Sequence, residues 1–312
     1  MSNMISTLKF FLWRFIYTPL FRIKYLKTYT ERHDFSILTS QETIKYIIAN
    51  KCSVSRMGDG EFQMMSHYIN NGSTNEYIID TFQSYNEHLS ARLTEVFRTQ
   101  KDNLLVCIPY AFKESSVYKG YERTFFEREW LEFKTMLFQF KGSKQRVFGD
   151  TCFSRFYMSR RDIDNYPQYI QLLQQIWDNQ DIVFIEGEQS RLGVGNNLFD
   201  NAKSIKRVLC PATNAFDKYE DILGYIKKHL GKDKLYLIAL GHTATILAYD
   251  LANAGYQAID IGHIDIEYEW YLMKAKKKIA IPNKYVNEVK EGRINSELND
   301  EIYLSQIIQH IN

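Results

Sequence analysis

Residues 234–262 have the sequence KLYLIALGHTATILAYDLANAGYQAIDIG, in which two short apolar runs flank one longer segment. The first run ends at Gly241 and the second at Gly262, and the segment at 243–254 has the pattern of a helix closed by Gly255. A near-continuous apolar strand is typical of a parallel sheet covered on both faces, because such a strand is buried on both sides. The segment therefore predicts a strand–helix–strand unit of an α/β fold.

The same alternation extends outward along the chain. Further strands are predicted at 53–57, 103–109, 145–148, 181–186 and 206–210. Further helices are predicted at 40–50, around 114–140, at 215–230 and, at the carboxyl end, at 295–312. The chain has no internal repeat and no Pro/Gly-rich linker, so we expect one catalytic domain, 36–312, after a leader, 1–35.

The leader is basic and aromatic. Residues 1–30 contain Lys and Arg side chains but no Asp or Glu. Their apolar stretch, 10–21, is broken by Arg14 and Pro19 and is shorter than the roughly 18 residues that a spanning helix needs. No small-residue cleavage site follows, so we expect no signal peptide. Two interpretations stay open: the leader lies in the headgroup plane at the inner face of the plasma membrane, or it is a helix packed on the body.

Composition restricts the possible partners. The net charge of +2 gives no strong positive field, so we expect no nucleic-acid partner. Hydrophobic residues at 45% and charged residues at 24% are typical of a globular chain, which excludes disordered and fibrous classes. The four cysteines are far apart in sequence, and three lie in or beside apolar runs. This pattern predicts reduced, buried thiols of a cytoplasmic protein.

The first candidate site follows the first predicted strand, in RMGDGEF at 56–62. Asp59 and Glu61 are one residue apart at a strand end, so both can approach one divalent cation that bridges to diphosphate oxygens. Hard oxygen ligands favour Mg²⁺ or Mn²⁺ over zinc. The alternative is a tight turn in which Glu61 complements the dipole of the following helix.

Two further loops follow predicted strands. In EGEQSRLGVGNN, 186–197, Gly193 and Gly195 let the backbone approach a ligand closely, and Arg191 can pair with a phosphate. A surface loop that needs positive φ angles explains these glycines equally well. In the GHTAT segment, Thr243 and the free amides of a helix start either cap the helix or cradle a phosphate.

The last candidate segment is GHIDIEYEW at 262–270, which has one histidine and three acids after an apolar run. The imidazole of His263 can complete a metal shell that carboxylates begin. A nearby acid, Asp265, Glu267 or Glu269, can take the proton from an acceptor hydroxyl. The alternative is a charged, exposed helix start. All these segments follow strands, and in open parallel sheets the ligand crevice lies beyond the carboxyl ends of the strands.

Together these segments resemble the bacterial glycosyltransferases of the GT-D fold type, whose metal-binding Asp-x-Glu motif lies in a Gly-Asp-Gly-Glu-Phe context. The resemblance covers residues 40–310 or so and rests on RMGDGEF at 56–62, EGEQSRLGVGNNLFDNAKSIKR at 186–207, CPATNAF at 210–216, ALGHTATILAYDLANAGYQAIDIGHIDIEYEW at 239–270 and KYVNEV at 284–289. It implies a Rossmann-like α/β fold, a UDP-glucose or UDP-galactose donor and a Mn²⁺ or Mg²⁺ cofactor.

The resemblance also implies roles for individual residues. Asp59 and Glu61 would be the metal and diphosphate pair, and His263 a further metal or phosphate contact. Glu269 would be the leading candidate base, with Glu267 and Asp265 as alternatives. The residues expected to hold the nucleotide are Arg56, Gly58, Arg155, Glu188, Arg191, Gly193, Gly195, Asn196, Asn197, Gly241 and Thr243. The family pattern is expected to have proline where this chain has His242.

The sequence thus predicts metal-dependent transfer of a hexose from a UDP-hexose to a hydroxyl of a lipid-linked or protein-linked surface glycan. Two alternatives stay open. In a nucleotide-sugar hydrolase, the same metal and base would activate water. In an accessory subunit, the chain would bind a nucleotide sugar without turning it over.

Overall fold

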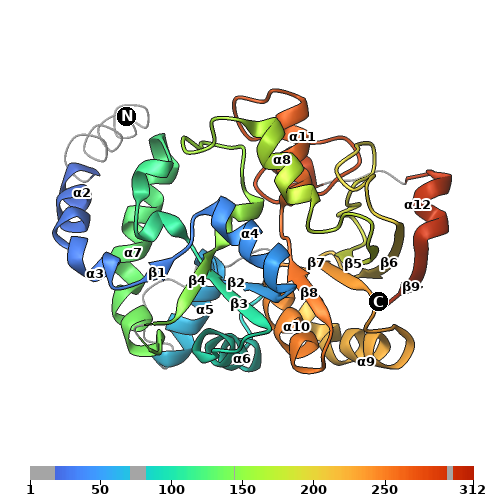
Figure 1. Ribbon diagram of the computed structural model, residues 1–312, viewed down its shortest axis with the longest axis horizontal. Coiled ribbons are helices and arrows are strands. Elements are labelled where there is room, and N and C mark those ends of the chain that lie inside the picture. Colours follow the sequence, from blue (N-terminus) through green and yellow to red (C-terminus); the bar gives the residue numbers. More distant parts are fainter. Residues whose placement is uncertain (1–17, 71–81, 144, 294–297) are drawn as a thin grey trace, which may run out of the picture.

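The computed structural model describes residues 18–70, 82–143, 145–293 and 298–312. In this part of the chain nine strands form one parallel sheet in the order β1-β4-β3-β2-β8-β7-β5-β6-β9 (Figure 1). The strands are β1 (Ser36–Ile37), β2 (Ser53–Arg56), β3 (Leu104–Ile108), β4 (Val147–Asp150), β5 (Asp181–Gly187), β6 (Ser204–Cys210), β7 (Leu235–Ala239), β8 (Gln257–Asp260) and β9 (Ile307–His310). The prediction of an α/β fold with a parallel sheet is confirmed.

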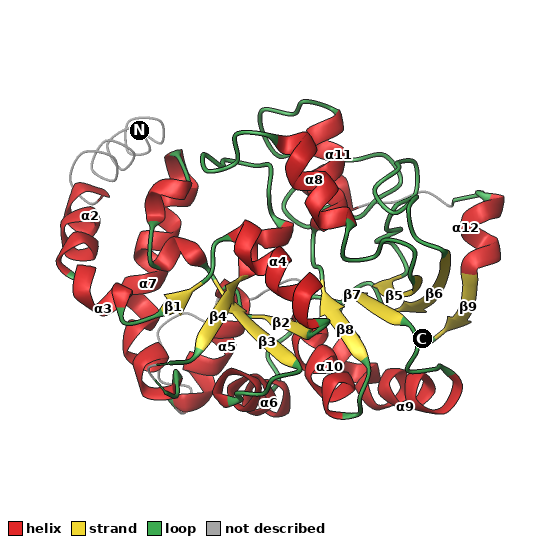
Figure 2. Cartoon of the chain, viewed as in Figure 1, coloured by secondary structure: helices red, strands yellow, loops and turns green. Residues whose placement is uncertain are grey.

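Helices cover both faces of this sheet (Figure 2). They are α2 (Thr18–Lys27), α3 (Tyr29–His33), α4 (Ser40–Asn50), α5 (Asp59–Ile69), α6 (Glu87–Arg98), α7 (Gly120–Phe140), α8 (Tyr166–Gln174), α9 (Tyr219–His229), α10 (His242–Asn253), α11 (Ile264–Leu272) and α12 (Glu301–Gln306). In β5, Val183 and Ile185 belong to the core that α5, α6, α9 and α10 share, whereas Ile182 and Phe184 belong to the core that α4, α8 and α11 share. Because successive strand residues point to opposite faces, each central strand is buried on both sides.

Local sequence fixes the start of α4, which has the predicted bounds Ser40–Asn50. The Thr39 side chain accepts from the backbone N–H of Glu42, and the Glu42 carboxylate accepts from the backbone N–H of Thr39 at 2.8 Å. Such a reciprocal capping box satisfies two backbone donors that the first helical turn leaves unpaired. It stabilises a helix by about 0.5–2 kcal/mol.

The carboxyl end differs from the prediction. The predicted helix over 295–312 is wrong, because within the described residues 298–312 the helix covers Glu301–Gln306 alone and Ile307–His310 forms β9. β9 pairs in parallel with β6, with Arg207 opposite Ile307. Without this strand, β6 would leave a row of backbone groups unpaired at the sheet edge, and β-branched residues such as Ile307 favour strands.

The described part of the leader packs on the body. α2 lies along α7 (Figure 1), and the buried Tyr25 hydroxyl lies 3.1 Å from the carbonyl oxygens of Ala111 and Phe112. Arg32 donates to the same hydroxyl at 2.8 Å. Residues 1–17 of the leader lie outside the described residues. Across the described ranges, no helix combines the length and the apolar character needed to cross a bilayer.

The four cysteines are buried and free, as predicted. Cys107 and Cys210 lie in strands, and Cys52 directly precedes one. Burial raises the pKa of Cys52 to about 12, so its thiol is protonated at neutral pH.

Candidate active site

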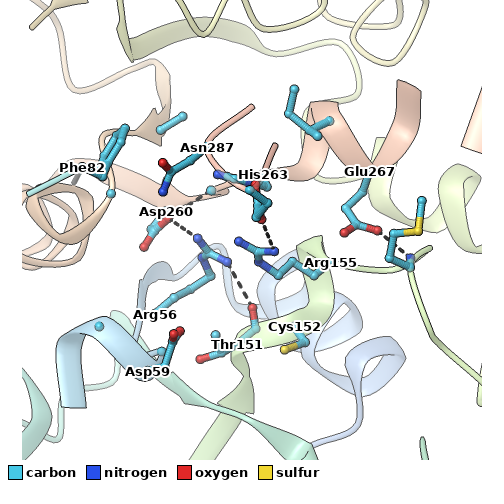
Figure 3. A pocket seen from close by; sticks show the side chains of 18 of the residues that line it. Arg56, Asp59, Phe82, Thr151, Cys152, Arg155, Asp260, His263, Glu267 and Asn287 are labelled. Atoms are coloured by element: carbon cyan, nitrogen blue, oxygen red, sulfur yellow. Dashed lines mark hydrogen bonds and ion pairs between the residues drawn. The ribbon is translucent and has the colours of Figure 1, made fainter. Parts of the chain in front are cut away.

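The candidate site lies where the strand order reverses. From β2 the chain moves outward to β3 and β4 on one side and later returns to β8 on the other, where Val54 pairs with Ile259. Open α/β sheets bind ligands beyond the carboxyl ends of their strands at such a switch point. A cavity of about 460 Å³ lies there, lined by residues that follow β2, β4, β7 and β8 (Figure 3). This volume lies within the usual range of small-molecule sites.

The predicted acid pair begins α5 directly after β2. Glu61 accepts a hydrogen bond from the Gly58 N–H at 2.8 Å, so it closes the first turn as a capping residue. Asp59 is exposed and lines the cavity (Figure 3). Both carboxylates lie at a helix N-terminus, where the helix dipole favours negative charge. Glu61 therefore caps α5, and Asp59 is the more exposed of the two carboxylates.

An ion pair spans the switch point beside these acids. Arg56, at the end of β2, donates to Asp260, at the end of β8, at 2.9 Å. A second arginine nitrogen donates to the Thr151 carbonyl at 3.2 Å and to the Ser154 hydroxyl at 3.0 Å. Burial raises the pKa of Asp260, although Arg56 acts in the opposite direction. Gly262 has φ +46°, and a Cβ there would overlap the Arg56 guanidinium, so this position requires glycine.

A second charged group also lines the cavity. Glu288 accepts from Arg155 at 2.9 Å and lies 3.2 Å from Nδ1 of His263. Burial acts to raise the pKa of Glu288, but His263 and Arg155 outweigh it and hold that pKa well below its ordinary value. A carboxylate beside one ring nitrogen fixes the orientation of an imidazole, an arrangement common behind metal-binding histidines.

The acids at the start of α11 are buried, so the alternative of an exposed helix start is wrong. Asp265 and Glu269 both accept from the buried Lys284 ammonium, at 2.6 and 2.8 Å. The Asn196 amide also donates to both, at 2.8 and 2.7 Å. Asp265 lines the cavity, whereas Glu269 is not among its lining residues.

Glu267 has a different environment. One of its oxygens accepts from the backbone N–H groups of Tyr157 at 2.8 Å and Met158 at 2.9 Å. Burial raises the pKa of Glu267, with Arg155 acting in the opposite direction. Glu267 also lines the cavity, so it is a buried acid that is held in a fixed orientation at the cavity wall.

Much of the 186–197 loop holds α11 in place. The Gly193 N–H donates to Asp265 at 3.0 Å, and Asn197 accepts from the Tyr268 hydroxyl at 2.6 Å. Arg191 of the same loop donates to the Asn283 carbonyl at 2.9 Å, which lies beyond the end of α11. Of the residues predicted to hold the nucleotide, four line the cavity: Arg56, Gly58, Arg155 and Gly241. Glu188 lines a separate hollow, and Arg191, Gly193, Gly195, Asn196, Asn197 and Thr243 line neither.

The side chains that the structure describes do not by themselves complete a metal site. In the described ranges no three His, Cys, Asp or Glu side chains converge as a metal-binding group, although Asp59, Glu61 and His263 line one cavity. Mg²⁺ is commonly bound by only one or two carboxylates, with waters and substrate phosphates as the remaining ligands. The exposed Asp59 carboxylate on the cavity wall fits that kind of site.

Sequence reasoning missed several residues of this cavity. Asp260 lies inside a predicted strand and ends the observed strand β8, and Glu288 and Asn287 lie in the KYVNEV segment. One side-chain oxygen each of Asn287 and Glu288 is buried and accepts no hydrogen bond from the described residues. Polar atoms in this state beside a cavity are expected to meet water or a ligand.

A doubly covered parallel sheet with charged side chains around a switch-point cavity is the architecture of α/β proteins that bind small molecules beyond their strand ends. The family model of the glycosyltransferase GT-D fold matches residues 54–289. The chain therefore belongs to the GT-D glycosyltransferase family, as its motifs predict.

Similar proteins occur in streptococci. Glycosyltransferase GlyD of Streptococcus pneumoniae serotype 4 is 35% identical over 272 residues, which are 86% of this chain and 32% of GlyD. The probable glycosyl transferase Gly of Streptococcus gordonii is 35% identical over 289 residues, which are 90% of this chain and 39% of that protein. The chain thus spans 32% to 39% of the length of these relatives.

Solved structures have the same fold. A domain of unknown function 1792, described as having a distinct glycosyltransferase fold, is 36% identical with a TM-score of 0.82, over 92% of this chain and 100% of that one. A glycosyltransferase with the same domain from Streptococcus sanguinis is 33% identical with a TM-score of 0.79, over 89% of this chain and 100% of that one.

Proposed function

We propose that this chain is a metal-dependent glycosyltransferase that moves glucose or galactose from a UDP-sugar to a hydroxyl of a surface polysaccharide or glycoprotein glycan. The observation that supports this proposal is that Asp59, Arg56 and Arg155 line one cavity at the switch point of the sheet. A sugar diphosphate can be bound by arginine donors and by a cation that carboxylates hold, and this cavity offers both kinds of group.

Asp59, together with Glu61, would hold Mn²⁺ or Mg²⁺, which supplies charge neutralisation of the departing diphosphate. Arg56 and Arg155 would orient the diphosphate, because Asp260 and Glu288 hold their guanidinium groups in place. His263, oriented by Glu288, would be a further contact to the metal or to phosphate.

We propose Glu267 as the base, ahead of Glu269 and Asp265. Glu267 lines the cavity, two backbone amides orient it, and burial raises its pKa, which makes it a stronger base than an ordinary carboxylate. The acceptor oxygen would bond to the anomeric carbon, the bond from that carbon to UDP would break, and the acceptor proton would pass to Glu267. UDP would leave with the electron pair. Glu269 is less suited, because Lys284 and Asn196 hold its carboxylate.

A donor screen tests the proposal. UDP release is measured from UDP-glucose, UDP-galactose and UDP-N-acetylglucosamine, with Mn²⁺ or EDTA, and with and without disaccharide acceptors. We expect acceptor-dependent release that EDTA abolishes and that Asp59→Asn lowers at least about 100-fold. The control Asp233→Asn changes a carboxylate that is 74% exposed and does not line the cavity. Equal release without acceptor would indicate a hydrolase, and no release in a single turnover would indicate a binding subunit.

We also propose that the leader makes peripheral contact with the inner face of the plasma membrane, which implies a cytoplasmic enzyme. α2 turns Leu20, Ile23 and Leu26 outward, and each side chain is more than half exposed. Lys24 and Lys27 are exposed on the same helix. Exposed apolar side chains beside lysines, in a segment without acids, fit the surface of an anionic bilayer.

A further inference from the structure

Four aromatic side chains line one end of the cavity: Tyr118, which precedes α7, and Tyr121, Phe125 and Phe126 in its first turns. Their rings form a continuous series. Tyr118 lies 4.8 Å from Phe126, Phe126 lies 5.3 Å from Phe125, and Phe125 lies 6.3 Å from Tyr121, measured between ring centroids. We call these four residues the aromatic track.

Exposure increases along the track. Tyr118 is 4% exposed, Phe125 and Phe126 are half-buried, and Tyr121 is 59% exposed. A ring that served only to pack the core would be buried. Core packing alone therefore does not explain the positions of the outer two rings, Tyr121 and Phe125. Aromatic surface held open beside a cavity is a common property of binding sites.

Helical spacing gives the track its shape. Tyr121 and Phe125 are four residues apart on α7, and so are Glu122 and Phe126, so the two pairs form neighbouring rows on one side of the helix. Glu122 also lines the cavity. A pyranose ring has an apolar C–H face that stacks on an aromatic ring, and its hydroxyls donate hydrogen bonds that a carboxylate accepts. The track offers both kinds of contact within one helical turn.

The inner end of the track and the proposed base line the same cavity and are linked through one chain segment. The segment beyond Tyr118 is joined to residues 157–161, since Lys119 N–H donates to the Ser159 carbonyl at 3.1 Å. Glu267 holds the same segment through the amides of Tyr157 and Met158. A glycan on the track would therefore reach the cavity on the side of Glu267.

We propose that the aromatic track is the acceptor subsite, which binds successive pyranose rings of a glycan and directs the terminal hydroxyl toward Glu267. This inference rests on the proposed glycosyl transfer, but it concerns a part of the cavity that the donor groups Asp59, Arg56 and Arg155 do not form. The partner is defined by its chemistry: a chain of at least two pyranose rings with free hydroxyls.

The test measures disaccharide binding without turnover. Saturation-transfer NMR with cellobiose and with N,N′-diacetylchitobiose is compared for wild type, Tyr121→Ala and Phe125→Leu. Phe125→Leu keeps apolar volume and removes the ring, so it separates stacking from packing. The matched control is Tyr29→Ala, because Tyr29 is 60% exposed but lies on α3 and does not line the cavity. Thermal unfolding checks that every variant is folded.

We expect wild type and Tyr29→Ala to bind at least one disaccharide, and Tyr121→Ala and Phe125→Leu to bind it about fivefold more weakly each. Equal binding by all four proteins, or no binding by wild type, would overturn the subsite. UDP affinity in Mn²⁺, measured on the same samples, addresses the donor site independently. Disaccharide binding without UDP binding would support the acceptor subsite and refute the proposed UDP-sugar donor.

Discussion

Replacing Lys284 with methionine tests whether the acids at the start of α11 are structural or catalytic. The buried Lys284 ammonium donates to Asp265 at 2.6 Å and to Glu269 at 2.8 Å. Methionine keeps most of the side-chain volume but removes the charge. Two buried carboxylates would then face each other, with the Asn196 amide and the Gly193 N–H as remaining partners.

The expected loss of stability is large. At 2.6 Å and an effective dielectric of about 20, the gross attraction in one pair is about 6 kcal/mol, and desolvation offsets much of it. Removing one partner of a buried pair costs about 3–5 kcal/mol, because the remaining charge stays buried. With an unfolding entropy of about 2.1 cal/mol/K per residue, a chain of 312 residues would lose about 5–8 °C in Tm.

Urea unfolding and calorimetry measure this loss, with Lys228→Met as the control at an exposed lysine near the end of α9. We expect the control to change the free energy of unfolding by less than about 1 kcal/mol. Adding Glu269→Gln to Lys284→Met should restore part of the stability, since it removes one of the two unpaired charges. A loss below about 1 kcal/mol, together with a loss of transfer above about 100-fold, would refute the structural role and return Glu269 to the position of base.

Three further outcomes are expected. Glu61→Gln keeps the cap on Gly58, so the free energy of unfolding should change by less than about 0.5 kcal/mol, while Mn²⁺-dependent UDP release falls at least about tenfold. If stability and UDP release fall together, Glu61 has a capping role only. Gly262→Ala should lower stability by about 1–3 kcal/mol in urea unfolding and weaken UDP binding, because it displaces Arg56. Unchanged UDP affinity would show that Arg56 does not bind the donor. Leu20→Ser with Ile23→Ser should lower cosedimentation with phosphatidylglycerol vesicles at least about tenfold. Cosedimentation equal to that of wild type would refute the proposed membrane contact.

The long strands could be predicted because burial on both faces leaves a continuous apolar run, as in β5 and β7. β9 could not, because its pairing depends on the edge of β6 nearly a hundred residues earlier. The partners of the charged side chains could not be predicted from the sequence either. Gly193 was predicted to let the backbone approach a ligand, and the structure instead shows its N–H donating to Asp265 of the same chain.

The ion pair between Arg56 and Asp260 predicts that stability and ligand binding are coupled at this site. The two residues are 204 positions apart in sequence yet end neighbouring strands, so the cavity forms only when β2 and β8 pair. Bringing such distant segments together costs loop-closure entropy, and the ion pair lies at that junction. Any change of Arg56 or Asp260 therefore alters folding as well as the cavity. Asp59 is exposed and outside this junction, so its replacement separates the chemistry of the site from the stability of the fold.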